Sequence, residues 1–282
     1  MSKVAILTDS NSGINFEAGK EIGVRVLPMP FLIDGKTYYE EISLSQTEFF
    51  EKLESDVDIS TSQPSPESVM KIWDDALEEA DEVVYIPMSS GLSSSCHTAL
   101  MLADDYEGKV QVVDNQRISV TQRQSVLDAL ELAKRGLTAA QIKAKFESSI
   151  YIMLDTLKYL KKGGRITPAA AALGSALRLK PVLTIQGEKL DAFAIAKTKK
   201  QGVKKMLSAI EDDINSRFGG VDHMENIHME IAHTKNPEAA EELRQQIIEK
   251  FGVKQVDLYP LSLSIACHIG PGSLAVACSK VI

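Results

Sequence analysis

The chain has 282 residues, of which 44% are hydrophobic and only 6% aromatic, and its formal net charge is −8 at pH 7. This length favours two domains of ordinary size, and the low aromatic content predicts an aliphatic core. The acidic balance argues against a general nucleic-acid binder, because phosphate affinity needs clustered cations, and against docking on anionic lipids through overall charge.

Hydropathy and cysteine usage limit the function classes further. No segment reaches the roughly 18 apolar residues that a membrane-spanning helix needs, so we expect no stable membrane insertion. The three cysteines, Cys96, Cys267 and Cys278, have the spacing of neither a disulfide framework nor a zinc site. We therefore expect a reduced, cytoplasmic protein with no metal or other cofactor.

In the first half of the chain, short apolar runs alternate with amphipathic segments. The pattern predicts strands at residues 4–7, 24–31, 83–86 and 110–113, and helices at residues 44–53, 66–80, 95–104 and 119–134. Ser65 is a good N-cap with Pro66 at the first helical position, and Gly136 closes the last helix. Repeated strand–helix units predict an α/β domain with a mostly parallel sheet over residues 1–150.

The second half, residues 151–282, has a different pattern. The expected elements are strands at 150–154, 181–185, 190–195, 227–232, 256–259 and 274–278, and helices at 169–177, 200–218 and 237–251. Residues 186–189 have the composition of a hairpin turn between two of these strands. A hairpin with packed helices predicts a second domain of the α+β class.

Three runs of hydroxyl side chains stand where an apolar strand ends or a helix begins. We call them the first, second and third hydroxyl loops, and they are residues 8–13 (Thr-Asp-Ser-Asn-Ser-Gly), 61–66 (Thr-Ser-Gln-Pro-Ser-Pro) and 89–95 (Ser-Ser-Gly-Leu-Ser-Ser-Ser). In α/β proteins ligands bind beyond the carboxyl ends of strands, and helix amino ends attract anions. The loops therefore predict a pocket for a small anionic head group held by neutral donors.

A Ser or Thr before a helix is usually a plain N-cap, and this is the simpler interpretation of any one loop. A cap needs one hydroxyl, whereas the third loop supplies five serines, with Gly91 among them to allow a close turn of the backbone. This surplus favours a binding site.

Two enzyme classes compete with a binding site. A nucleotide site needs a glycine-rich loop ending in Gly-Lys-Ser/Thr, and the chain has none. A serine esterase or lipase-like hydrolase would use Ser93 and His268, with Asp9 completing a triad. The nucleophile elbow is incomplete, however, because the second glycine of Gly-x-Ser-x-Gly is missing around Ser93.

Taken in order, the motifs resemble those of the DegV family over about residues 4 to 277. They are Thr8-Asp9-Ser10, Thr61-Ser62-Gln63-Pro64-Ser65, Ser89-Ser90-Gly91-Leu92-Ser93, Gly163-Gly164-Arg165-Ile166, Leu179-Lys180-Pro181 and His268-Ile269-Gly270-Pro271-Gly272. Each motif alone is weak, and their order and spacing together carry the resemblance.

The resemblance implies a two-domain fold with a long-chain fatty acid, such as palmitate, stearate or oleate, in a buried tunnel between the domains. It implies a subunit without catalytic activity of its own, which presents the carboxylate to a separate ATP-dependent fatty acid kinase for acyl-phosphate formation. Thr61 and Ser93 would bind the carboxylate, and His268 would belong to its hydrogen-bond network.

Further residues are expected to assist this site. They are Ser94 at the carboxylate, Asp9, Ser10 and Ser62 behind it, and Arg165, Lys197 and Lys200 as contacts of the partner. The chain departs from the family pattern in three places, one of which is Cys96-His97, where an aromatic and a glutamine are usual. Ser94-Ser95 stand where Gly-Thr is common, which bears on the head-group contacts, and Lys197 replaces a common arginine, which bears on the kinase contact.

Overall fold

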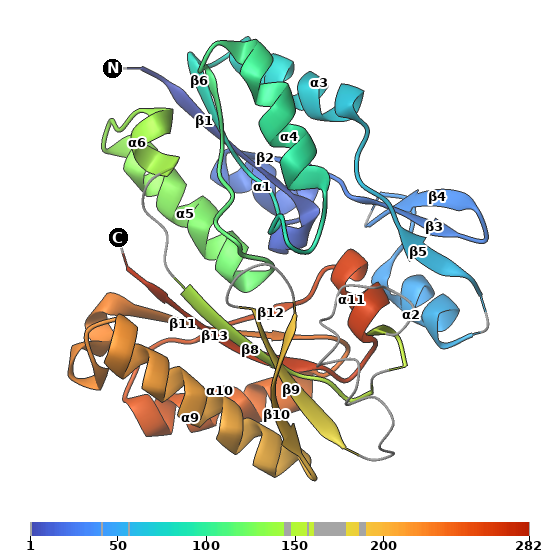
Figure 1. The fold of residues 1–282 in the computed structure, drawn as a ribbon, viewed down its shortest axis with the longest axis vertical. Coiled ribbons are helices and arrows are strands. Elements are labelled where there is room, and N and C mark those ends of the chain that lie inside the picture. The colour runs from blue at the N-terminus through green and yellow to red at the C-terminus, as the bar shows by residue number, and fades with distance from the viewer. Residues whose placement is uncertain are drawn as a thin grey trace. The chain divides into compact units, whose positions relative to one another are not determined.

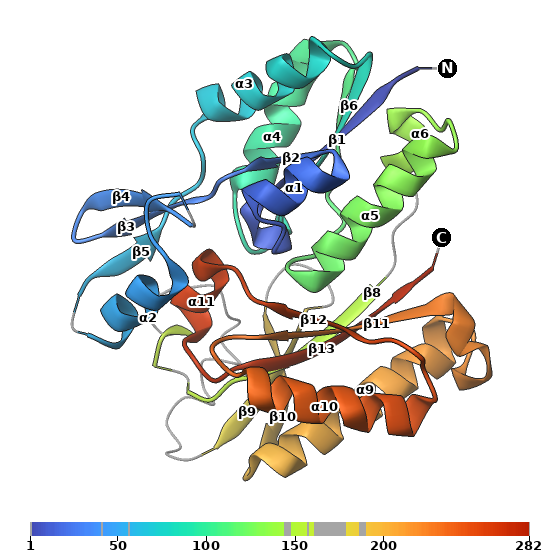
Figure 2. The same cartoon turned by 180° about the vertical axis from the view of Figure 1, so that it is seen from behind.

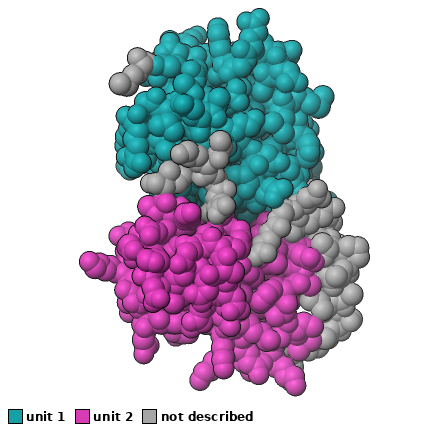
Figure 3. Space-filling model, turned by 60° about the vertical axis from the view of Figure 1, so that its left-hand side comes forward, with its two compact units in different colours: residues 1–146, 262–264 teal, residues 147–261, 265–282 magenta. Residues whose placement is uncertain are grey.

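The computed structural model describes residues 2–40, 42–55, 57–143, 148–156, 158–160, 179–185 and 190–281. The chain divides into two compact units (Figure 3). Unit 1 comprises Met1–Phe146 and Ser262–Ser264, and unit 2 comprises Glu147–Leu261 and Ile265–Ile282. The sequence predicts domains 1–150 and 151–282, and it carries no sign that a three-residue segment near the end of the chain groups with unit 1.

Unit 1 is built on a parallel sheet of four strands in the order β2-β1-β6-β7. The strands are β1 (Val4–Asp9), β2 (Val24–Leu27), β6 (Glu82–Ile86) and β7 (Val110–Val112). The inner strands β1 and β6 end in unbroken runs of buried residues, as expected where helices cover both faces of a parallel sheet. In the edge strands β2 and β7, Arg25 and Gln111 interrupt the buried aliphatic residues. The predicted α/β class of this part of the chain is confirmed.

Helices cover both faces of this sheet (Figures 1 and 2). They are α1 (Phe16–Ile22), α3 (Pro66–Leu77), α4 (Ser95–Ala103), α5 (Val120–Lys134) and α6 (Ala139–Lys143). On the face covered by α3 and α4, the fully buried Trp73 packs edge-on against Tyr85 and Tyr106. Ser65 caps α3 by accepting from the Ser68 N–H at 3.1 Å, with Pro66 at the first helical position as the sequence predicts.

A small antiparallel sheet, ordered β4-β3-β5, belongs to the same unit. It consists of β3 (Pro30–Ile33), β4 (Lys36–Tyr39) and β5 (Ile59–Thr61), with α2 (Gln46–Glu54) following β4 in the chain. The single strand predicted over residues 24–31 is wrong, because β2 ends at Leu27 and β3 begins at Pro30. Pro28 and Pro30 cannot donate to a strand ladder, which explains the break.

Unit 2 is built on a mixed sheet of six strands in the order β10-β9-β8-β13-β11-β12. The strands are β8 (Ser148–Met153), β9 (Lys180–Ile185), β10 (Asp191–Ala196), β11 (Ile227–His233), β12 (Asp257–Pro260) and β13 (Leu274–Lys280). Among the described strands of this sheet, β11 and β12 pair in parallel and the other neighbours pair antiparallel. The pair of β9 and β10 forms the predicted antiparallel hairpin. The turn at 186–189 and the helix predicted at 169–177 lie outside the described residues.

Two long helices, α9 (Lys199–Arg217) and α10 (Pro237–Phe251), cover one face of this sheet (Figure 1). A third and shorter helix, α11 (Leu263–Ile269), begins in the segment that groups with unit 1 and ends in unit 2. The sequence prediction missed α11. In the part of the chain that the structure describes, no helix is long and apolar enough to span a bilayer, and no group of three acidic, His or Cys residues could hold a metal.

Candidate functional site

The first and third hydroxyl loops are joined in unit 1 through Asp9. Strands β1 and β6 are parallel neighbours with Thr8 opposite Ile86, so the loops that follow them leave the sheet at the same edge. The Met88 N–H donates to Asp9 Oδ2 at 2.8 Å. The Asn11 amide nitrogen Nδ2 lies 3.1 Å from Met88 Sδ. One buried carboxylate therefore fixes the backbone immediately before the third loop.

Asp9 is fully buried, and its second oxygen is also occupied. Oδ1 accepts from the Asn11 N–H at 3.0 Å and from Gln122 Nε2 at 3.1 Å. Burial raises the pKa of Asp9, and the hydrogen bonds from Met88, Gln122 and Asn11 offset part of that rise. Through these contacts Asp9 holds the first loop against the start of the third loop.

The third loop ends at the amino terminus of α4, and Ser93 sits at that junction. The Ser93 N–H donates to the Ser89 carbonyl at 3.1 Å, and the Ser93 hydroxyl oxygen accepts from the Ser95 N–H at 3.2 Å. Ser89 is buried, Ser93 is partly exposed and Ser94 is exposed. The loop thus has a fixed backbone and keeps three of its serines, Ser90, Ser93 and Ser94, at partly or fully exposed positions.

The second loop is tied to the third by a side-chain hydrogen bond. Ser94 Oγ donates to Gln63 Oε1 at 3.1 Å. Thr61 ends strand β5, where it pairs with Phe31, and the Ser62 N–H donates to the Pro30 carbonyl at 3.1 Å. The hydrogen bond between Ser94 and Gln63 thus joins the second loop, which contains Thr61, to the third loop, which contains Ser93, within unit 1.

Ser10 connects the first loop to the small sheet. Its hydroxyl oxygen accepts from the Met29 N–H at 3.1 Å, directly before β3. All three hydroxyl loops are consequently linked within unit 1. The second and third loops contain no Lys or Arg, so any anion bound there would rely on hydroxyl and backbone N–H donors and on the positive ends of α3 and α4.

His268 lies in unit 2, in the last turn of α11, and is half-buried. Ser264, one turn earlier in the same helix, groups with unit 1, and its hydroxyl donates to Asn11 Oδ1 of the first loop. In the sequence His268 stands before Gly270-Pro271-Gly272, and the structure shows that it lies at the end of helix α11, directly before that turn.

Of the three residues expected to contact the partner, the structure describes Lys197 and Lys200. Lys197 and Lys200 are exposed at the amino end of α9 in unit 2, and the Lys197 N–H donates to Gln201 Oε1 at 3.0 Å. Arg165 lies outside the described residues.

A hydrolase triad is disfavoured by the contacts of Asp9. A triad carboxylate accepts from the histidine, whereas the donors to Asp9 that the described residues supply are Met88, Asn11 and Gln122. The Ser93 hydroxyl oxygen, in turn, accepts from the Ser95 N–H at the helix start. The contacts of Asp9 and Ser93 therefore favour a loop that binds and positions a ligand over a loop that activates a serine nucleophile.

Two residues that shape the loops escaped the sequence prediction. Gln122, fully buried on α5, donates to Thr8, Asp9 and the Ile86 carbonyl, all within 3.1 Å. Ser264 contacts the first loop from a distance of more than 250 residues along the chain. For Gln122 there is a weak sequence signal, a polar residue in a helix that packs on a parallel sheet. For Ser264 no local sequence signal exists.

Comparison with known proteins gives a consistent family match. The model of the family described as "Uncharacterised protein, DegV family" matches residues 3–281. A DegV domain-containing protein from Deinococcus radiodurans is 30% identical over 283 residues, covering 97% of both chains. One from Staphylococcus aureus strain N315 is 26% identical over 285 residues, covering 99% of this chain and all of the relative.

Solved structures agree with this match. A DegV family protein from Thermus thermophilus, described for its fatty acid binding, has a TM-score of 0.88 and 30% identity over the full length of both chains. A stearic acid-binding protein from Eubacterium ventriosum has a TM-score of 0.86 at 20% identity, covering 99% of this chain and 98% of that one, which supports the fold alone.

The raised pKa of Asp9 predicts a pH dependence of stability that an Asp9→Asn variant lacks. Above the ordinary pKa of 3.8, the unfolded state releases a proton that folded Asp9 still holds. The free energy of unfolding of the wild type, relative to Asp9→Asn, should therefore fall as pH rises from about 4, and level off above the folded-state pKa. Urea unfolding of both proteins between pH 4 and pH 8 measures this difference, and a difference that grows with pH would contradict it.

Proposed function

The chain belongs to the DegV family, and from that membership we propose that it binds a long-chain fatty acid, such as palmitate, stearate or oleate. The proposed head-group site is formed by the second and third hydroxyl loops. The observation that carries the proposal is the linked set of neutral donors in unit 1, on a chain that matches the fatty-acid-binding Thermus protein over its whole length.

The energetics fit a lipid with a small polar head. Burying a methylene contributes ~0.8 kcal/mol, so twelve would contribute on the order of 10 kcal/mol before the costs of association. A hydrogen bond to a charged group contributes about 1.5–3 kcal/mol. The tail would dominate affinity, while the hydroxyls would fix the carboxylate and prevent its burial without partners.

Each expected residue takes a role in this proposal. Thr61 and Ser93 bind the carboxylate, and Ser94 supports it from a position already anchored to Gln63. His268 contributes a further hydrogen bond from α11. The residues that hold the loops are Asp9, Ser10 and Ser62. Arg165, which matches the Gly-Gly-Arg-Ile motif of the family, is proposed as a partner contact.

We further propose that the protein presents the carboxylate to a separate ATP-dependent kinase and has no catalytic activity alone. In that reaction a carboxylate oxygen forms a bond to the γ-phosphorus of ATP. The bond from that phosphorus to the β–γ bridging oxygen breaks, and ADP leaves with the electron pair. The protein would hold the nucleophile, and the kinase would supply the nucleotide.

The amino end of α9 is the proposed docking surface for this kinase. Lys199 and Lys200 occupy its first turn, and Lys197 lies immediately before its Thr198 cap. Cations at a helix amino end oppose the helix dipole, so helix stability does not explain them. Exposed charges of this kind act mainly on the rate of encounter with an acidic partner.

Removing a head-group donor should weaken binding of a fatty acid more than binding of its methyl ester. Thr61→Ala and Ser93→Ala should each lower the ratio of oleate to methyl oleate affinity by about tenfold to 150-fold, the equivalent of one hydrogen bond to a charge. Ser60→Ala, in the same strand as Thr61 and exposed, serves as the matched control. Fluorescence competition measures both affinities, and an unchanged ratio in both variants would reject these head-group assignments.

Charge reversal at the docking surface should impair the kinase reaction and spare the lipid. Lys197→Glu and Lys200→Glu should raise the KM of a fatty acid kinase for the loaded protein, most strongly at low salt, with bound lipid unchanged. Lys254→Glu, which is exposed beyond the carboxyl end of α10, controls for net charge. Acyl-phosphate formation from ATP gives the readout. Equal KM values for all three variants at low salt would place the docking surface elsewhere.

A further inference from the structure

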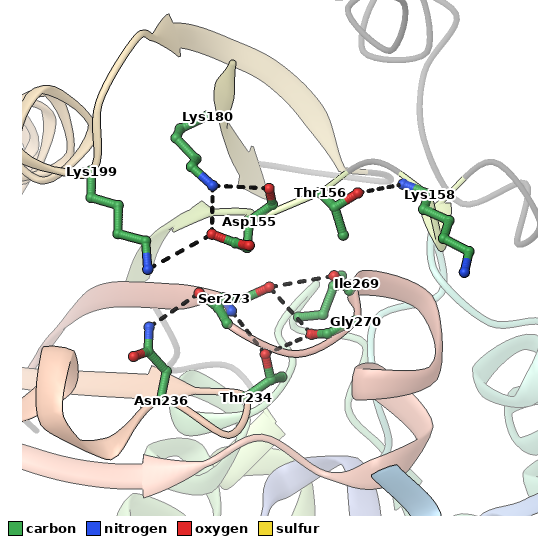
Figure 4. Close-up of polar contacts among 11 residues, drawn as sticks. Asp155, Thr156, Lys158, Lys180, Lys199, Thr234, Asn236, Ile269, Gly270 and Ser273 are labelled. Atoms are coloured by element: carbon green, nitrogen blue, oxygen red, sulfur yellow. Dashed lines mark hydrogen bonds and ion pairs between the residues drawn. The ribbon is translucent and has the colours of Figure 1, made fainter. Parts of the chain in front are cut away.

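The turn that follows His268 is more heavily constrained than a chain reversal requires (Figure 4). Helix α11 ends as the Gly270 N–H donates to the Ala266 carbonyl at 2.8 Å. Gly270 and Gly272 then adopt φ angles of +73° and +84°, which residues with a Cβ rarely adopt. Two separate sets of contacts hold this turn, and both belong to unit 2.

Thr234 and Asn236, which follow β11, hold one side. The Thr234 hydroxyl donates to the Gly270 carbonyl at 2.6 Å and accepts from the Ser273 N–H at 2.9 Å. The Thr234 carbonyl accepts from the Gly272 N–H at 2.7 Å. Asn236 Nδ2 donates to the Gly272 carbonyl at 3.1 Å. The Thr234 side chain, 1% exposed, thus bridges the two ends of the turn.

Asp155 and Tyr159, which follow β8, hold the other side. A Cβ at Gly272 would lie 3.0 Å from the Asp155 Cβ, and a Cβ at Gly270 would lie 2.2 Å from the Tyr159 ring. The two glycines are therefore required for this close approach as well as for their backbone angles.

An ion pair anchors Asp155 in this position. Lys180 Nζ donates to the Asp155 carbonyl at 3.1 Å and to its Oδ1 at 2.5 Å. Lys199 Nζ lies 3.8 Å from the same Oδ1. The side chains of Lys180 and Asp155 are 20% and 39% exposed, so the pair is only partly buried and contributes modestly to stability. Its position beside the Gly272 turn suits a role in orientation.

We propose that Thr234, together with the Asp155–Lys180 pair, positions His268. The turn fixes the end of α11, and His268 lies two residues before it, so the direction of the imidazole depends on both sets of contacts. This inference rests on the proposed function, in which His268 donates to a bound carboxylate. A group that orients a ligand must hold its geometry to a fraction of an ångström, and supporting hydrogen bonds provide that precision.

Thr234→Val gives the most direct test, because valine keeps the shape and removes both hydrogen bonds of the hydroxyl. Thr234→Ser restores the hydroxyl. Thr184→Val is the matched control, because the Thr184 hydroxyl also donates to a backbone carbonyl of unit 2, that of Ile150 at 3.2 Å. The readouts are the side-chain NMR signals of His268 and the ratio of oleate to methyl oleate affinity.

We expect Thr234→Val to shift the His268 signals and to lower the affinity ratio about threefold or more, a fraction of the effect expected for the lost hydrogen bond to a charge. Thr234→Ser should retain both wild-type properties, as should Thr184→Val. Lys180→Met should reproduce the effect of Thr234→Val, while Lys250→Met, which removes the Lys250–Glu211 pair, should not. Because the lysine variants test the second set of contacts, the inference stays testable even if Thr234→Val fails to fold.

Two outcomes would overturn the inference, and both are distinguishable from a failure of the proposed function. Unchanged His268 signals and ratio in Thr234→Val or Lys180→Met would show that these contacts serve folding alone. An unchanged ratio in His268→Ala would show that His268 has no head-group role to be positioned for. A wild-type protein that binds no oleate would instead refute the proposed function itself.

Discussion

The parallel pairing of β1 with β6 is the constraint on which the candidate site depends. Because Thr8 stands opposite Ile86, the first and third hydroxyl loops leave one edge of the sheet together. Asp9 then accepts from the Met88 N–H, and Ser94 extends the connection to Gln63 in the second loop. Separate strand ends thereby become one set of hydroxyl and N–H donors.

The buried carboxylate of Asp9 is the group that holds the first and third hydroxyl loops together. Three donors converge on it, and burial still raises its pKa. Its role is to hold two loops against each other at an electrostatic cost. Ser93 and Ser94 offer hydroxyls at accessible positions of the third loop, and the Ser90 N–H of the same loop donates to an oxygen of a second carboxylate, Asp114 Oδ1, at 3.2 Å.

The sequence predicts what depends on local pattern and misses what depends on long-range contact. The apolar runs of β1 and β6, the Ser65 cap and the hydroxyl loops have local signals, and the structure contains them. The break between β2 and β3 does have a local signal, Pro28 and Pro30, which the prediction of one strand over residues 24–31 overlooked. Helix α11 has only seven residues, and Gln122 reaches Asp9 across more than 100 positions in the chain, so neither leaves a periodic pattern.

Native mass spectrometry of the purified protein detects a bound lipid without assuming which residues hold it. We expect a mass increment of one long-chain fatty acid on most molecules, which extraction and fragmentation would identify. A protein that carries no fatty acid as purified, and that takes up neither palmitate nor oleate when they are added, would contradict this expectation.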